Sequence, residues 1–145
     1  MAQLSYDDRL IYLIGQARQR LYTQLDKALL AQAGVTAAQA AALFFLTQKD
    51  GCLLMELSRG LMLDKSAITR MAERLEKKEL IERRPCPHDG RAVRVHLTPA
   101  GRWAAKACLT TVKTHNDAIK ESFSDAEIQS FSRILQTVIQ RFTEE

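Results

Sequence analysis

Residues 61–78 read LMLDKSAITRMAERLEKK and carry the clearest helical pattern in the chain. Asp64 is suited to cap a helix from Lys65 to about Lys78, because its carboxylate can accept hydrogen bonds from the free amides of the first turn. Apolar residues recur on one side of this helix, at Ile68, Met71, Ala72 and Leu75. The other side carries Ser66, Thr69, Arg70, Glu73 and Lys77. The pattern predicts one buried side and one side of hydroxyls and charges.

Three helices are expected before this one. A long amphipathic helix should run from Leu10 until Gly34 ends it. Thr36-x-x-Gln39 is a capping box, so a second helix should start there and continue to about Lys49. A short third helix should cover roughly residues 53–59, with Gly60 as its stop.

Two short strands and two helices are expected after it. Residues 81–84 and 92–97 have strand patterns, and the turn-rich loop between them contains an Asp89-Gly90 step. Thr98 should cap a fifth helix, with Pro99 at its first position. Ser124-x-x-Glu127 is a second capping box and starts a sixth helix. This order predicts a mainly α protein with a small β-hairpin wing, which is a winged helix-turn-helix with long flanking helices.

The positive charge is concentrated around the helix predicted from Lys65 to about Lys78, which would be the recognition helix, and around the hairpin wing. The chain has 145 residues and a formal net charge of +4. Residues 65–102 hold ten of the 21 Lys and Arg residues but only five of the 17 acids, so this segment carries +5 and the remainder −1. Short hydroxyls and a guanidinium on a helix can reach base edges in the major groove, and a hairpin arginine can enter the minor groove. The segment therefore favours double-stranded DNA as the partner.

Several motifs in this segment resemble the MarR family of bacterial transcription regulators. The family pattern is a Ser/Thr-x-x-Thr-Arg recognition helix, then Leu-Glu-x-x-Gly-Leu-Ile-x-Arg, Asp-x-Arg in the wing and Leu-Thr-x-x-Gly. Residues 66–70, 75–83, 89–91 and 97–101 match it in order. Residues 35–39, VTAAQ, are similar to the family's opening of the second helix. Glu79 departs from the pattern, because the family usually has glycine there.

The resemblance implies a homodimer whose two winged domains meet successive major grooves of a pseudo-palindrome. We therefore expect dimerisation helices in residues 1–33 and 98–145 around a DNA-binding domain of residues 34–97. Carried over by position, Ser66, Thr69 and Arg70 would face bases or nearby phosphates. Arg91 would enter the minor groove at the wing tip, with Asp89 orienting it or a neighbouring arginine by charge pairing. Weaker candidates for phosphate contact, each equally well read as a solvated charge, are Lys65, Arg74, Arg83 and Arg84.

Family members are usually repressors released by a small molecule, often an aromatic acid or phenolic compound. The resemblance thus implies an effector that binds between the dimerisation helices and the winged domain. Scattered aromatic residues are more often plain core. Those that would suit such a pocket are Tyr12, Tyr22, Phe44, Phe45 and Trp103. A winged domain that docks protein instead of DNA is the competing interpretation.

Other classes of function are disfavoured. The sequence has no Gly-rich phosphate loop, nucleophile elbow or metal-ligand pair at helical spacing, so we expect no enzyme, no metal and no cofactor. The three cysteines are odd in number and widely spaced, which indicates a reducing cytoplasm. Cys86 is the one cysteine whose neighbours favour a lower pKa, and we interpret it as an inert exposed thiol. Residues 28–48 lack charges, but they are mostly alanine and polar residues and do not indicate a membrane span.

Overall fold

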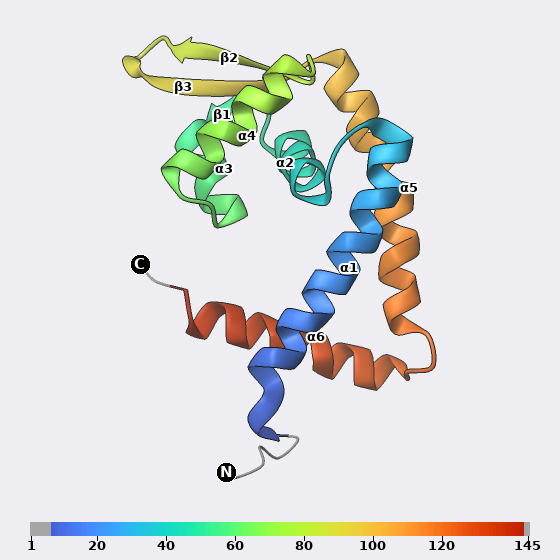
Figure 1. Ribbon diagram of the computed structural model, residues 1–145. Coiled ribbons are helices and arrows are strands. Elements are labelled where there is room, and N and C mark those ends of the chain that lie inside the picture. The colour runs from blue at the N-terminus through green and yellow to red at the C-terminus, as the bar shows by residue number, and fades with distance from the viewer. Residues whose placement is uncertain (1–6, 144–145) are drawn as a thin grey trace. The chain divides into compact units, whose positions relative to one another are not determined.

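The computed structural model describes residues 7–143 (Figure 1). These residues form a mainly α protein with a small antiparallel sheet, as the sequence predicts. The chain divides into two compact units, one up to Val112 and one from Lys113 onward. The elements in order are a 3-10 turn Asp7–Arg9, α1 Leu10–Ala33, α2 Ala37–Gln48, β1 Cys52–Leu53, α3 Leu54–Leu61, α4 Lys65–Lys77, β2 Ile81–Cys86, β3 Asp89–Leu97, α5 Pro99–Lys120 and α6 Asp125–Arg141.

The break between α1 and α2 follows the predicted capping signals. Gly34 ends α1 in the left-handed conformation, with φ of 69°, and its N–H donates to the carbonyl of Leu30 at 3.1 Å. The Thr36 hydroxyl accepts from the Gln39 amide at 3.1 Å, and the Gln39 side chain accepts from the Thr36 amide at 3.1 Å. Each partner satisfies an amide that the first helical turn leaves free, so the capping box is confirmed.

The prediction that Gly60 stops the third helix is wrong. Gly60 lies inside α3, and a Cβ at this position would stand 2.2 Å from Cε2 of the Phe45 ring. Glycine is therefore required there by the close approach of α2 and α3. The helix ends instead at Leu61, and the capping residue Met62 has a φ of 56°, in the left-handed region.

The wing belongs to a sheet of three strands, where only two were predicted. The strand order is β1-β3-β2, with both pairs antiparallel. β1 is too short to leave a pattern in the sequence, and Cys52 pairs with Val95. β2 and β3 also extend further than expected, so that only residues 87–88 connect them. Pro85 is accommodated because β2 is an edge strand and the register shifts beside it.

The apolar side of α4 packs into the core of the first unit as predicted. Ile68, Ala72 and Leu75 are buried, and Met71 packs against them. Asp64 caps the helix by accepting from the Ala67 amide at 2.7 Å. Because this side is buried, the opposite side of α4 faces the solvent. The core around it is formed mainly by Leu29, Leu43, Leu46, Leu57, Val95, Leu97 and Ala104.

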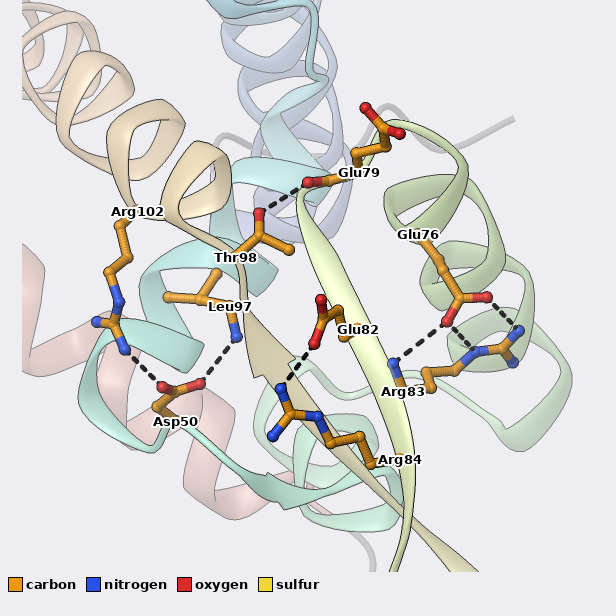
Figure 2. Close-up of polar contacts among 9 residues, drawn as sticks. All are labelled: Asp50, Glu76, Glu79, Glu82, Arg83, Arg84, Leu97, Thr98 and Arg102. Carbon is orange, nitrogen blue, oxygen red and sulfur yellow. Dashed lines mark hydrogen bonds and ion pairs between the residues drawn. The ribbon is translucent and has the colours of Figure 1, made fainter.

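The start of α5 is tied to the turn after α4. The Thr98 hydroxyl accepts from the Gly101 amide at 3.0 Å, which confirms the predicted cap, and donates to the Glu79 carbonyl at 2.7 Å (Figure 2). A Cβ on Gly101 would stand 2.0 Å from the Leu80 carbonyl oxygen, so the two backbones are in direct contact. This contact fixes the position at which α5 begins after β3.

Large apolar side chains remain exposed on the long helices. α1 exposes Leu10, Ile11, Tyr12, Leu13 and Ile14. In the second unit, α6 begins at the predicted Ser124 capping box, and none of its described side chains is buried. It exposes Phe131, Ile134 and Ile139. Exposed apolar surface of this extent on a helix usually marks a binding surface.

No single helix within residues 7–143 is long and apolar enough to cross a membrane. Helices α1 and α2 satisfy the length and composition requirement only when taken together, and the chain bends by 67° between them.

Candidate nucleic-acid interface

The N-terminal turn of α4 presents a chain of hydrogen bonds on its outer side. The Ser66 hydroxyl donates to Oδ1 of Asp64 at 3.1 Å, and Nη2 of Arg70 lies 3.4 Å from the Ser66 oxygen. The Ala67 amide and the Ser66 side chain lower the pKa of the Asp64 carboxyl, which keeps it ionised. Ser66 and Arg70 are exposed, and Thr69 is partly exposed. The polar side chains predicted for this face are therefore accessible.

The wing tip carries Asp89 and Arg91, both exposed. Oδ1 of Asp89 accepts from the backbone N–H of Arg91 at 3.0 Å. This bond replaces the charge pairing that we expected, because the carboxylate holds the backbone of the turn and makes no ion pair with the guanidinium. The Arg91 side chain is thus left available for another anion.

Two surface clefts join α4 to its surroundings. One, of about 460 Å³, is lined by Lys65 and Thr69 of α4 together with Asp89 and Arg91 of the wing. Its remaining walls are mostly apolar and come from α3, α4, β1 and β3. The other, of about 310 Å³, is lined by Ser66, Arg70 and Arg74 and by the first residues of α2. One cleft therefore joins α4 to the wing, and the other joins α4 to the start of α2, which sequence reasoning missed.

Three arginines of the basic segment are held in ion pairs (Figure 2). Arg83 contacts Glu76 through Nη2 at 3.0 Å and Nε at 3.2 Å, and its backbone N–H donates to the same carboxylate. Arg84 pairs with Glu82 at 2.7 Å, and Arg102 pairs with Asp50 at 2.5 Å. The Arg83 contacts lower the pKa of Glu76 and raise that of Arg83, so both groups stay charged.

Two further cations are bound to uncharged oxygens. Nη1 of Arg94 donates to the Gly51 carbonyl at 2.9 Å. Nζ of Lys78 donates to the Gly34 carbonyl at 2.7 Å and to Oε1 of Gln39 at 2.8 Å. Partial burial, aided by nearby Arg74, lowers the pKa of Lys78. No local sequence pattern indicates this contact, because the partners of Lys78 lie 44 and 39 residues away.

The remaining cations of the segment make no ion pair with any residue in the part of the chain that the structure describes. They are Lys65, Arg70, Arg74, Lys77 and Arg91. Four lie on α4 and one at the wing tip. The cations of this segment that neither pair with a carboxylate nor donate to a carbonyl or amide oxygen of the chain therefore lie on the predicted recognition surface, where an anionic polymer can neutralise them.

Two other expectations have mixed outcomes. Cys86 was expected to be exposed, but only 7% of its surface is accessible. The backbone amide of His88 and the Arg94 side chain lower its pKa, whereas burial raises the pKa of Cys52 and of Cys108. Of the five aromatic residues proposed for an effector pocket, Phe44 and Phe45 pack against the core, and Tyr12 and Trp103 are each 65% exposed. A shared pocket formed by them stays a prediction.

Comparison with known proteins identifies the fold family. The model of the MarR family matches residues 33–92, which span α2 to the wing. The multiple antibiotic resistance protein MarR of Escherichia coli is 32% identical over 133 residues, which cover 90% of this chain and 89% of that protein. The chain belongs to the MarR family. Homologues in this family are regulators of transcription and not enzymes.

Solved structures of similar regulators have the same fold over most of the chain. A probable transcriptional regulator from Pseudomonas aeruginosa is 33% identical, with a TM-score of 0.81, over 93% of this chain and 100% of that one. BpsR of Bordetella bronchiseptica, whose DNA binding is regulated by 6-hydroxynicotinic acid, has a TM-score of 0.85 at 21% identity. That match covers 99% of this chain and 100% of BpsR, and it supports the fold alone.

The departure of this chain from the MarR pattern at position 79 has a structural consequence. Glu79 has a φ of 63°, the left-handed conformation that glycine adopts without strain. A residue with a Cβ is strained there. The position is a tight turn between α4 and β2, and the carbonyl of Glu79 is held by Thr98. The departure therefore affects the turn and not the outer side of α4.

Proposed function

We propose that this protein is a repressor that binds pseudo-palindromic operators in double-stranded DNA as a homodimer and is released by a small-molecule effector. The observation that carries the proposal is the location of the unpaired cations on α4 and the wing tip. A cation that is already paired within the chain would release few counterions from DNA. Lys65, Arg70, Arg74, Lys77 and Arg91 make no such pair among the described residues, so they are available to replace the counterions of the phosphates.

The residues of α4 and the wing have distinct roles in this proposal. Ser66, Thr69 and Arg70 lie on the outer side of α4 and read base edges or nearby phosphates in the major groove. Arg91 enters the adjacent minor groove, and Asp89 holds the turn that presents it. Arg74 contacts phosphate. Arg84 is exposed at its guanidinium despite its ion pair and contributes a weaker phosphate contact, while the bidentate pair with Glu76 assigns Arg83 a structural role.

A homodimer would cover the apolar surface of the long helices. Leu10, Ile11 and Ile14 of α1 and Phe131 and Ile134 of α6 are exposed in a single chain. A two-fold axis would bury each of these surfaces against a second copy and place two basic faces along one duplex. The free thiols of Cys52, Cys86 and Cys108 support an origin in the reducing cytoplasm, where the chromosome is located.

The effector is proposed to be a small aromatic acid or phenolic compound. The regulation of BpsR by 6-hydroxynicotinic acid supports this class, because that ligand combines an aromatic ring with a carboxylate. An effector releases DNA only if it binds the released conformation more tightly than the DNA-bound one.

Selection of bound duplexes from a random DNA pool tests the proposal. We expect enrichment of a two-fold symmetric sequence. The logarithm of the association constant should fall with the logarithm of the salt concentration, at a slope of about −0.9 per phosphate contact. Repeating the binding with a panel of aromatic acids and phenols should identify a compound that lowers affinity. Failure to enrich any duplex would favour the competing function, docking of a protein partner by the winged domain.

A further inference from the structure

The corner between α1 and α2 is contacted by the residue that caps the C-terminal end of α4. Lys78 immediately follows α4, and its Nζ donates to the Gly34 carbonyl at 2.7 Å and to Oε1 of Gln39 at 2.8 Å. Gly34 is the residue that ends α1, and Gln39 belongs to the capping box that begins α2. One ammonium group therefore connects three helices at a single point.

The acceptors of Lys78 are themselves fixed. Gln39 is buried, with 6% of its surface accessible, and its Oε1 also accepts from the Thr36 amide at 3.1 Å. On the same corner, Oδ1 of Asp26 in α1 accepts from the Ala37 amide at 2.7 Å. These bonds define the angle at which α2 leaves α1. Lys78 adds the one polar link between this corner and the end of α4 that the described residues make.

Geometry makes this link important for a dimer. α1 has 24 residues, so at 1.5 Å per residue it is about 36 Å long. A change of about 5° at its base therefore displaces its far end by about 3 Å. Successive base pairs are about 3.4 Å apart, so a small change in this angle moves one recognition helix past the other by nearly a full base pair.

We propose that Lys78 is a positioning residue for operator recognition, which fixes the direction of α1 relative to α4 and thereby the spacing of the two recognition helices. The inference rests on the proposed homodimer and its DNA operator. Lys78 contacts no base in this role. It acts through Gly34 and Gln39, and its effect appears only when both half-sites are engaged.

The test measures affinity against a series of duplexes that differ in half-site spacing by one base pair at a time around about 10 base pairs. Lys78→Met keeps the length of the side chain and removes its donors. We expect this variant to lose about fivefold or more in affinity at the wild-type optimum and to have a shifted or broader spacing profile. Affinity for a duplex with a single half-site should stay within about twofold, because that contact does not depend on the second subunit.

Two variants separate positioning from a loss of charge or of folding. Lys106→Met removes one exposed positive charge from α5, outside the proposed DNA-binding surface, and controls for net charge in a variant verified to be dimeric. Lys78→Arg retains a donor and should restore the wild-type spacing profile. Gln39→Met removes one acceptor, and its effect on spacing should not add to that of Lys78→Met if both act through one contact. Circular dichroism and sedimentation verify that each variant is folded and dimeric.

The outcomes distinguish this inference from the proposal on which it rests. An unchanged spacing profile in Lys78→Met, with equal losses on single and paired half-sites, would overturn the positioning role while leaving the repressor function intact. If Lys78→Met does not fold, Gln39→Met and Lys78→Arg decide by the same criterion. A wild-type protein that binds no paired site in preference to a single one would overturn the homodimer model and the role of Lys78 with it.

Discussion

The carboxylate of Glu76, on the recognition helix, holds the guanidinium of Arg83, on the first strand of the wing, through hydrogen bonds at 3.0 and 3.2 Å. It also accepts from the backbone amide of Arg83 at 3.2 Å. The pair connects α4 and the wing, the two elements that we propose contact DNA together. It also explains why one arginine of the basic segment is unavailable for phosphate.

Removal of this pair should reduce stability in a pH-dependent manner. The contacts with Arg83 lower the pKa of Glu76 from its ordinary value of 4.5, so their stabilisation is present above pH 4.5 and lost as pH falls through the lower folded-state pKa. Because the Glu76 side chain is 40% exposed, solvent screens the pair and we expect Glu76→Gln to cost only about 0.2–1 kcal/mol at pH 7. Urea unfolding at fixed protein concentration, at pH 7 and at about pH 3, measures this difference.

Glu73→Gln is the matched control, since Glu73 lies on the same helix and makes no ion pair with the residues that the structure describes. Its unfolding midpoint should differ little from wild type at either pH. A cost in Glu76→Gln that persisted below pH 3 would mean that shape and not charge holds the wing to α4.

Arg91 and Arg84 should differ in their contribution to DNA binding, although both are exposed wing arginines. Arg91 makes no ion pair among the described residues, whereas Arg84 pairs with Glu82 at 2.7 Å. We expect Arg91→Ala to weaken operator binding on the order of tenfold and to reduce the salt slope by about one. Arg84→Ala should have a smaller effect. Fluorescence anisotropy at several salt concentrations compares the affinities of the two variants. Equal losses of affinity would contradict the claim that the ion pair with Glu82 reduces the contribution of Arg84.

Arg70 should contribute to base preference, in contrast to Arg74 one turn further along α4. Arg70 lies beside the Ser66 hydroxyl near the N-terminal end of the helix, where side chains of a recognition helix contact base edges. Arg70→Ala should cost about 1–3 kcal/mol and relax the preference at one position of each half-site. Arg74→Ala should weaken binding to all duplexes alike. Repeated selection from random DNA separates the two cases, and a uniform loss in Arg70→Ala would make it a phosphate contact.

Features determined by neighbours in the sequence could be predicted, and those determined by distant contacts could not. The caps at Thr36, Asp64 and Ser124 were predicted because each cap and its amide partner lie three residues apart. Gly60 was misread because its role depends on the ring of Phe45, which no local pattern reveals. β1 was missed because two residues leave no alternation to detect.

The same distinction applies to the candidate interface. Helical periodicity places Ser66, Thr69 and Arg70 outward without knowledge of the fold, because the apolar side of α4 must face the core. Whether a given arginine is already neutralised depends on elements that meet only in three dimensions, as Arg102 and Asp50 do across 52 residues. Sequence could therefore locate the basic segment but not its unpaired members.

The turn after α4 offers a substitution that should stabilise the protein without changing DNA binding. Glu79 has a φ of 63°, and a left-handed conformation costs a residue with a Cβ about 1–2 kcal/mol. Glycine removes this strain but makes the unfolded chain more flexible, at a cost of about 0.5–1 kcal/mol. The difference is a gain of about 0–1.5 kcal/mol, so we expect Glu79→Gly to raise the free energy of unfolding by somewhat less than about 1 kcal/mol. Operator affinity should not change, because the carbonyl of residue 79 still accepts from Thr98 and the outer side of α4 is untouched.

A Glu→Gly substitution inside α4 should have the opposite effect on stability. Glu73→Gly, at an exposed position in the interior of α4, should lower the free energy of unfolding by about 1 kcal/mol, because glycine is a poor helix former. Thermal and urea unfolding of the two variants at one protein concentration therefore tests the sign as well as the size of the effect. If both variants lost stability equally, the left-handed turn at Glu79 would be unstrained, and its backbone conformation would have to be favoured by the hydrogen bond from Thr98.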